Sequence, residues 1–308
     1  MVPTGTQYRI SRGDERATVT EVGAGIREYG HGQSQGEREV FQSYPERDVS
    51  WAFHGSVLLP WPNRVRDGRY AFDGVEHQLA LTEPSRRNAI HGLVAWQQWS
   101  LLEHGVESVA LQCRTYPSPG YPFQLDNVVR YELVEAGLTV TTTSVNAGDT
   151  ACPYAIGFHP YVSTGNGVAL DDCTLLIPAS RRLLVDERLN PVGSELVEGT
   201  ESDFRAPRSL RGRFLDDCFT GVLPDGSGRS WVHLASPDGN VVDVWADSSF
   251  GFWQVYSGDA LPEPLTRRSL AIEPMTAAPN AFQSGDGLLR LEPGDSVTTQ
   301  WGAQLRQV

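Results

Sequence analysis

The sequence predicts an all-β protein built from many antiparallel strands, on the basis of three observations. Apolar and polar residues alternate along much of the chain, which is typical of strands with one buried face. Glycine, proline and Asp-Gly pairs interrupt this alternation at short intervals, as expected of hairpin turns. Apolar residues at helical spacing are almost absent, so we expect little helix.

Four hairpins are predicted where two alternating runs flank a short turn. Asp73-Gly74 and Asp238-Gly239 favour tight hairpin turns because these residue types tolerate positive φ. Gly105 and Gly137 provide the permissive position in the other two turns. In chain order, the predicted strand pairs are Arg69–Phe72 with His77–Leu81, Trp99–Glu103 with Val109–Thr115, Val129–Val134 with Leu138–Thr143, and Trp231–Ser236 with Val241–Trp245.

The chain is expected to form one domain over residues 1–308. Its length of 308 residues is compatible with a single large β domain and allows a sizeable core. Stretches rich in glycine, proline and charge are predicted to be loops, namely Gly30–Pro45, Ser163–Ala169 and Leu189–Arg208. None has the composition of a long flexible linker, so we expect no boundary between independent domains.

The charge of the chain restricts its partners. A formal net charge of −13 argues against nucleic acids and anionic membranes, which attract a surplus of lysine and arginine. The N-terminus lacks the basic start and apolar core of an export signal, and no apolar run approaches the length of a membrane span. We therefore expect a cytoplasmic protein, a monomer or homodimer, that acts on a small neutral molecule.

The four cysteines are predicted to be buried thiols rather than disulfides; they are Cys113, Cys152, Cys173 and Cys218. They are widely spaced, form no CxxC pair and have no histidine at metal-ligand spacing. Sequence patterns of serine hydrolases, dinucleotide and nucleotide binding, and zinc proteases are also missing. We expect neither a metal nor a cofactor.

Three polar segments embedded in apolar residues carry the strongest chemical signal, and they are Asn88–Leu93, Gly157–Tyr161 and Ala271–Thr276. They offer the side chains of His91, His159 and Glu273. Two imidazoles and a carboxylate among residues that exclude water suit acid/base chemistry near neutral pH. Histidine titrates in this range, and burial raises the pKa of a carboxyl group toward it.

Each of these residues also has a purely structural interpretation. His159 could be a satisfied core histidine, although Gly157 and Pro160 beside it indicate a shaped backbone at a strand end. Glu273 could be paired with an arginine, whereas burial without such a partner would make it a competent general base.

A second group of residues could hold a ligand. His91 and Arg64 are candidates for binding polar groups of a substrate, and Arg64 could instead neutralise a buried carboxylate. Asp216 and its neighbour Asp217 lie among apolar residues. At these two positions the sequence is as compatible with turn capping as with ligand binding.

Five short segments, taken together and in this order, resemble the aldose 1-epimerase, or galactose mutarotase, family. They are Pro62-Asn-Arg64, Ile90-His-Gly92, Gly157-Phe-His-Pro-Tyr161, Leu215-Asp-Asp-Cys-Phe219 and Ile272-Glu-Pro274. The resemblance extends from about Val22 to Trp301. It implies a single large antiparallel β-sandwich of the galactose mutarotase type, with the sugar in a cleft on one curved face. It requires no metal or redox cofactor.

Carried over position by position, the resemblance implies that Glu273 is the general base and His159 the general acid. Glu273 would take the proton of the anomeric hydroxyl while His159 protonates the ring oxygen, so that the pyranose opens and recloses as the other anomer. The implied substrate is a free hexose such as glucose or galactose. The implied ligands of the sugar hydroxyls are Asn63, Arg64, His91 and Asp216.

The chain departs from the galactose-preferring members of this family at two positions. Leu93 stands where those members tend to repeat glycine, and Asp217 stands where they commonly carry histidine. The chain is also somewhat shorter, which resembles bacterial branches that include enzymes acting on hexose 6-phosphates. Arg86 and Arg87 could clamp such a phosphate, or they could form a solvated turn.

Two other classes of protein are compatible with these residues. A catalytically silent sugar-binding sandwich would need a cleft but no proton-transfer pair, which argues against it. A glycosidase could use Asp216 and Glu273 as its two carboxylates. Tryptophans that could stack on a sugar are Trp51, Trp61 and Trp96, although most tryptophans in a sandwich belong to the core.

Overall fold

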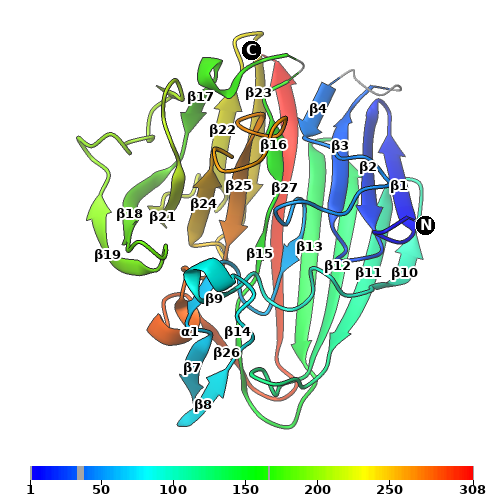
Figure 1. The fold of residues 1–308 in the computed structure, drawn as a ribbon. Helices are drawn as coiled ribbons and strands as arrows, with labels where there is room; N and C mark the ends of the chain where they lie inside the picture. The colour runs from blue at the N-terminus through cyan, green and yellow to red at the C-terminus, as the bar shows by residue number, and fades with distance from the viewer. Residues whose placement is uncertain (1, 33–37, 166, 308) are drawn as a thin grey trace.

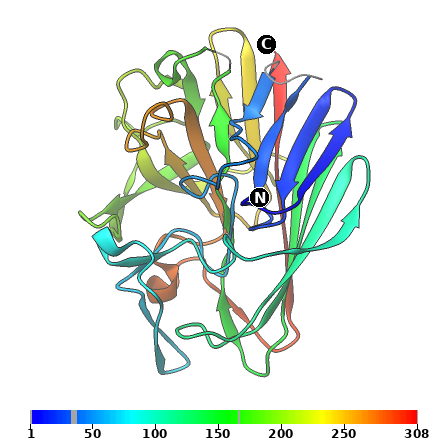
Figure 2. The same ribbon diagram turned by 45° about the vertical axis from the view of Figure 1, so that its right-hand side comes forward.

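The computed structural model describes residues 2–32, 38–165 and 167–307, and within them β-strands dominate the chain. The two largest sheets are layered face to face (Figures 1 and 2). Strands β1 and β2 of one sheet contact β12 of the other. This arrangement confirms the predicted antiparallel β-sandwich.

The larger sheet contains most of the N-terminal and central strands. In spatial order they are β1 (Gln7–Arg12), β2 (Glu15–Thr20), β3 (Ile26–His31), β4 (Arg38–Phe41), β16 (Tyr161–Ser163), β25 (Ser269–Met275), β24 (Phe252–Tyr256), β21 (Asp216–Val222), β18 (Ala179–Val185) and β19 (Pro191–Leu196). Strand β15 (Gly157–Phe158) also pairs with β25, and it continues to β5 (Val57–Leu58).

The second sheet has nine strands in the described part of the chain. In spatial order they are β10 (Ser100–His104), β11 (Ser108–Thr115), β12 (Leu125–Val134), β13 (Gly137–Asn146), β27 (Ser296–Gln307), β23 (Asn240–Ala246), β22 (Ser230–Ala235), β17 (Thr174–Leu176) and β20 (Arg208–Ser209). Strands β12 and β13 alternate between buried and partly exposed residues over most of their length, which is the pattern that their sequence predicts.

Smaller elements complete the fold, and several of them gather at one end of the sandwich (Figure 1). The short pairs are β6 (Arg64–Arg66) with β9 (Asn88–Ile90), β7 (Arg69–Phe72) with β8 (Val75–Gln78), and β14 (Cys152–Tyr154) with β26 (Leu289–Leu291). The helical turns are η1 (Pro84–Arg86), η2 (Leu170–Asp172) and α1 (Ala281–Ser284). No helix in the described residues is long and apolar enough to cross a bilayer.

All four predicted hairpins are present, with strand bounds that differ by a few residues. Strand β12 begins at Leu125 rather than Val129, and β8 begins at Val75 because the Asp73-Gly74 turn leaves no spacer. The loop predictions were partly wrong. Strand β19 lies inside Leu189–Arg208, where an edge position tolerates its first residue, Pro191.

The predicted loop Gly30–Pro45 was also partly wrong. It contains the end of β3 and all of β4, which pairs with β3 on one side and with β16 on the other. Residues 33–37 of this stretch lie outside the described residues. The cysteine prediction is confirmed, because all four thiols are free and buried.

The core lies between the two sheets and is rich in aromatic side chains, including Trp99, Trp253 and Trp301. Every one of the seven residues of strand β25 is buried. One face of β25 packs Leu270 and Ile272 into this core. The opposite face carries Glu273, and the segments that cover it enclose the cavity described next.

Candidate active site

A cavity of about 500 Å³ lies on the face of the larger sheet that carries Glu273. It brings together all six predicted site residues: Asn63, Arg64, His91, His159, Asp216 and Glu273. His159 and Glu273 are buried and form its floor, whereas Phe214 is 64% exposed and stands at its mouth. A larger hollow of about 750 Å³ beside β2–β4 contains none of the six.

The strand register places the carboxyl groups of Asp216 and Glu273 on the same wall of the cavity. Glu273 pairs with Gln254 of β24, and Tyr256 of the same strand pairs with Asp216 of β21. Directly paired residues, and residues two apart on one strand, project from the same face of a sheet. Asp216, Gln254 and Glu273 therefore face the cavity together.

The position of His159 depends on a close approach between strands. His159 follows β15 immediately, and Gly157 of β15 pairs with Met275 of β25. A Cβ atom at Gly157 would lie 2.7 Å from the Cβ of Pro62, and only 3.1 Å from the Cγ of Met275 and 3.2 Å from the carbonyl oxygen of Pro274 in β25. Glycine therefore lets β15 approach β25, and this brings the imidazole to the carboxylate.

His91 and Asn63 hold each other in an unusual backbone conformation. Both have positive φ, 62° and 53°, which is uncommon outside glycine and is frequent at functional sites. The backbone N–H of His91 donates to the carbonyl of Asn63 (2.9 Å), and the N–H of Asn63 donates to Nδ1 of His91 (3.2 Å). Because Nδ1 accepts, Nε2 carries the proton of the neutral ring and can donate to a ligand.

Arg64 is placed both at the cavity and beside a carboxylate. It lines the cavity, and its guanidinium makes a bidentate ion pair with Glu83 at 2.9 and 3.0 Å. Glu83 also accepts hydrogen bonds from Arg86 (3.1 Å) and Asn88 (2.9 Å). Sequence reasoning missed Glu83, because a glutamate in a polar turn carries no signal of its own.

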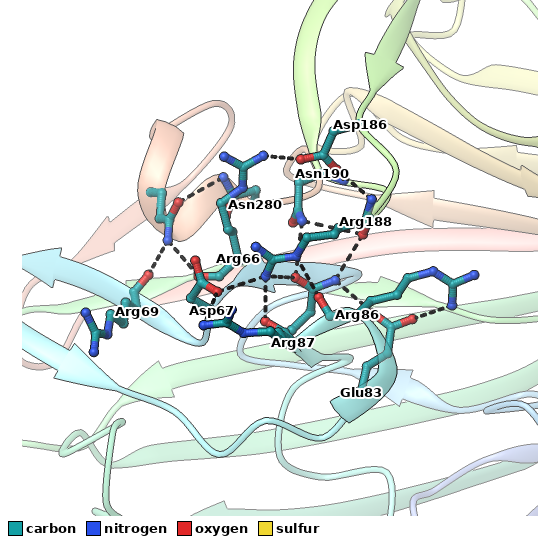
Figure 3. A network of polar contacts seen from close by, with 12 residues as sticks. Arg66, Asp67, Arg69, Glu83, Arg86, Arg87, Asp186, Arg188, Asn190 and Asn280 are labelled. Atoms are coloured by element: carbon teal, nitrogen blue, oxygen red, sulfur yellow. Dashed lines mark hydrogen bonds and ion pairs between the residues drawn. The ribbon is translucent and has the colours of Figure 1, made fainter.

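A network of polar contacts supports this side of the cavity (Figure 3). It begins at the turn between β18 and β19, where Arg188 donates to the carbonyls of Arg86 (2.8 Å) and Arg87 (2.9 Å). Asn190 donates to the side chain of Asn88 (3.2 Å), which in turn donates to Glu83. The turn is therefore fastened to the segment that holds Arg64.

His159 and Glu273 form the central contact, with 3.4 Å between Nε2 and Oε1. Among the described residues Glu273 has no ion-pair partner other than His159, so the interpretation that it pairs with an arginine was wrong. Burial raises the pKa of Glu273 well above its usual range; the charge of Asp216 adds to this shift and Arg64 opposes it. Burial lowers the pKa of His159 to about 3, and nearby His54 adds to this shift.

Asp216 lies in the cavity wall rather than in a turn. Its Oδ1 accepts a hydrogen bond from Gln254 (2.8 Å), and burial raises its pKa against the opposing charges of Arg64 and Arg86. The turn-capping interpretation was therefore wrong for this residue. Gln254 was missed, although an amide between Trp253 and Val255 in an apolar strand is a signal that could have identified it.

The remaining candidates are divided between the cavity and the core. Asp217 lines the cavity in an ion pair with Arg182 (3.1 Å), whereas Leu93 packs against the core. Arg86 lines the cavity but Arg87 does not. None of the three tryptophans considered above lines it; the lining aromatic residues are Phe53, Tyr161, Phe214 and Tyr256. No cluster able to hold a metal ion occurs among the described residues.

Comparison with known proteins shows the family and the fold of the chain. The family model named aldose 1-epimerase matches residues 6–302. The chain belongs to the aldose 1-epimerase family. The structure is similar to that of an aldose epimerase homologue from C. elegans, with a TM-score of 0.86 and 19% sequence identity. The match covers 98% of the present chain and 99% of the C. elegans chain.

Two Escherichia coli relatives are also similar to this aldose 1-epimerase family member. The uncharacterized protein YihR is 37% identical over 94% of this chain and 90% of its own length. The protein named aldose 1-epimerase is 27% identical over 63% of this chain and 58% of its own length.

Proposed function

We propose that the protein is an aldose 1-epimerase that interconverts the α and β anomers of a hexose. The main support is the 3.4 Å contact between Nε2 of His159 and Oε1 of Glu273 at the buried floor of the cavity. The anomeric hydroxyl and the ring oxygen are bonded to the same carbon. A neighbouring base and acid can therefore act on both oxygens at once.

In the proposed reaction Glu273 removes the proton of the anomeric hydroxyl while His159 protonates the ring oxygen. The bond between the anomeric carbon and the ring oxygen breaks, and its electron pair stays on that oxygen. The free aldehyde rotates about the C1–C2 bond, and reclosure with the two roles reversed gives the other anomer. Polar groups that can hold the open chain are Asn63, Arg64, His91 and Asp216.

Burial favours a form of the His159–Glu273 pair that holds one proton. Burial lowers the pKa of His159 to about 3 and raises that of Glu273, so both effects disfavour separate charges. With one proton the pair is neutral as a unit, and the proton can reside on either group. The tautomer with a carboxylate and an imidazolium contains the base and the acid that ring opening requires.

The charge balance of the cavity favours a neutral sugar. Each arginine that lines it already has a carboxylate partner: Arg64 and Arg86 share Glu83, and Arg182 binds Asp217 and Glu195. A phosphate would have to compete with these ion pairs.

A hexose 6-phosphate is the second candidate substrate, and one observation favours it. Arg86 lines the cavity with a side chain that is 44% exposed, and it shares its carboxylate partner with Arg64. It could therefore turn toward a phosphate at the mouth. The close contact between His159 and Glu273 favours ring opening over the glycosidase and binding-only alternatives.

Polarimetry tests the proposal directly. Freshly dissolved α-D-glucose and α-D-galactose are expected to reach their final rotations faster with the enzyme, without a change in those rotations. A kcat/KM on glucose 6-phosphate far above that on glucose would select the second candidate. No acceleration with any of the three sugars, together with measurable sugar binding, would contradict catalysis and favour a binding protein.

The pH dependence should reflect the one-proton pair. Below the lowered pKa of His159, about 3, the pair holds two protons and lacks a base; above the raised pKa of Glu273 it holds none and lacks an acid. After subtraction of the spontaneous rate, activity should therefore persist as the pH rises through the ordinary titration range of histidine. An independent histidine of pKa ~6.5 would instead cause a fall of more than about tenfold between pH 6 and pH 8.

A further inference from the structure

The proposed general acid, His159, is one end of a stack of three rings. The ring of Tyr161 packs against the imidazole of His159, with centroids 5.0 Å apart and planes 20° apart. The ring of Tyr161 also stacks on His54, with centroids 5.2 Å apart and planes 7° apart. The edge of His91 contacts His159 from another side, at 5.3 Å and 71°. Rings therefore restrict His159 from two directions.

This packing occurs where a hydrogen bond usually orients a catalytic histidine. In Ser-His-Asp triads and at metal sites, a carboxylate or carbonyl holds the second ring nitrogen. Here Nε2 of His159 faces Glu273, and Nδ1 is buried without a hydrogen-bond partner among the described residues. The described part of the chain thus provides ring contacts, rather than a second hydrogen bond, to fix the imidazole.

Tyr161 is itself firmly placed. It begins β16 and pairs with Ala271 of β25, the strand that carries Glu273. Its hydroxyl donates to the carbonyl of Ala52 (3.4 Å), and Trp51 packs on its ring at 4.7 Å. Its position is therefore fixed relative to the carboxylate by the sheet itself.

His54 supports the far side of the stack. It is 1% exposed and is enclosed by Tyr44 (5.2 Å) and Trp51 (4.8 Å) in addition to Tyr161. Burial lowers the pKa of His54 to about 4, so it is uncharged at neutral pH. Sequence reasoning did not single out His54, because its ring contacts include a residue of a distant segment, Tyr161.

We propose that Tyr161 is a positioning residue that holds the His159 imidazole against Glu273 through its ring face, and that His54 supports it from behind. The inference rests on the proposed function. The two rings can contact each other because His159 and Tyr161 are only two positions apart in the chain, with Pro160 between them. The ring face also attracts a cation, which favours the protonated form of His159 that donates to the sugar.

The test compares Tyr161→Phe, which keeps the ring, with Tyr161→Leu, which removes it. The Phe variant should keep at least about half of kcat, because the hydroxyl makes only one long hydrogen bond. The Leu variant should lose about 10- to 100-fold in kcat, since small misplacements of a catalytic group have effects of this size. KM should change by less than about threefold in both, because the polar sugar ligands remain.

Tyr131→Leu is the matched control, because Tyr131 is equally buried but lies in β12 of the other sheet. A loss of kcat in this variant as large as in Tyr161→Leu would indicate general destabilisation and would contradict the proposal. Equal kcat for wild type, Tyr161→Phe and Tyr161→Leu would also overturn it. A wild type without epimerase activity would instead reject the proposed function.

His54 provides a second pair of variants if Tyr161→Leu does not fold. His54→Phe keeps a ring in the stack and should retain activity, whereas His54→Leu should lower kcat with KM unchanged. Indistinguishable kcat values for these two variants would contradict the supporting role of His54.

Discussion

Glutamine in place of Glu273 is expected to lower kcat by about 10² to 10⁴, the usual contribution of a positioned acid or base. The amide is nearly isosteric with the carboxylate but cannot accept the proton of the anomeric hydroxyl. KM should change little, because the groups that bind the sugar are other residues of the cavity. Burial raises the pKa of Glu273, so its charged form is disfavoured in the fold and a neutral amide should not lower Tm.

The experiment needs one control and one rescue. Glu103 of β10 forms a surface ion pair with Arg130 of β12, outside the cavity, so Glu103→Gln should leave kcat and Tm unchanged. Glu273→Ala leaves space at the floor, and added formate should restore part of its turnover by acting as the missing base. Full activity of Glu273→Gln would remove Glu273 from the mechanism.

The strands and both members of the proton-transfer pair, His159 and Glu273, could be predicted from the sequence because each leaves a local signal. Alternation, turn residues and apolar runs are local properties, and they identified the hairpins. Glu273 was conspicuous because it interrupts the apolar strand β25, and His159 because Gly157 and Pro160 shape the chain around it. An ionisable group where packing prefers an apolar one leaves a local signal.

The residues that were missed lack such a signal. Glu83 lies in a polar turn, and its importance comes from the bidentate contact with Arg64, nineteen positions earlier in the chain. Tyr161 and His54 are separated by more than a hundred residues, yet their rings are parallel in the fold. These two contacts depend on which segments the fold brings together, so periodicity and spacing cannot identify them.

The same argument explains the misplaced loops. Strand β19 is an exposed edge strand with proline and glycine among its six residues, a composition that local rules assign to a loop. Its pairing with β18 is fixed by the turn between them. That turn is fastened across the cavity wall by Arg188 and Asn190. Tertiary contacts therefore override the weak strand propensity of the segment.

Replacing His159 by glutamine should reduce kcat by a similar factor, about 10² to 10⁴, and should also reverse the pH dependence. Without the imidazole the residual rate depends only on ionised Glu273, which is present above its raised pKa. Residual activity should therefore increase with pH. Wild-type activity should instead decrease once the pair loses its single proton.

Polarimetric rates from pH 5 to pH 9, corrected for the spontaneous reaction, distinguish these two profiles. His104→Gln is the matched control, because His104 is an exposed histidine on β10 outside the cavity, and it should follow the wild-type profile. A His159→Gln enzyme that is slower but keeps the wild-type decrease at high pH would show that another group donates the proton. The opposite slopes are therefore a more specific test of His159 as the general acid than the loss of rate alone.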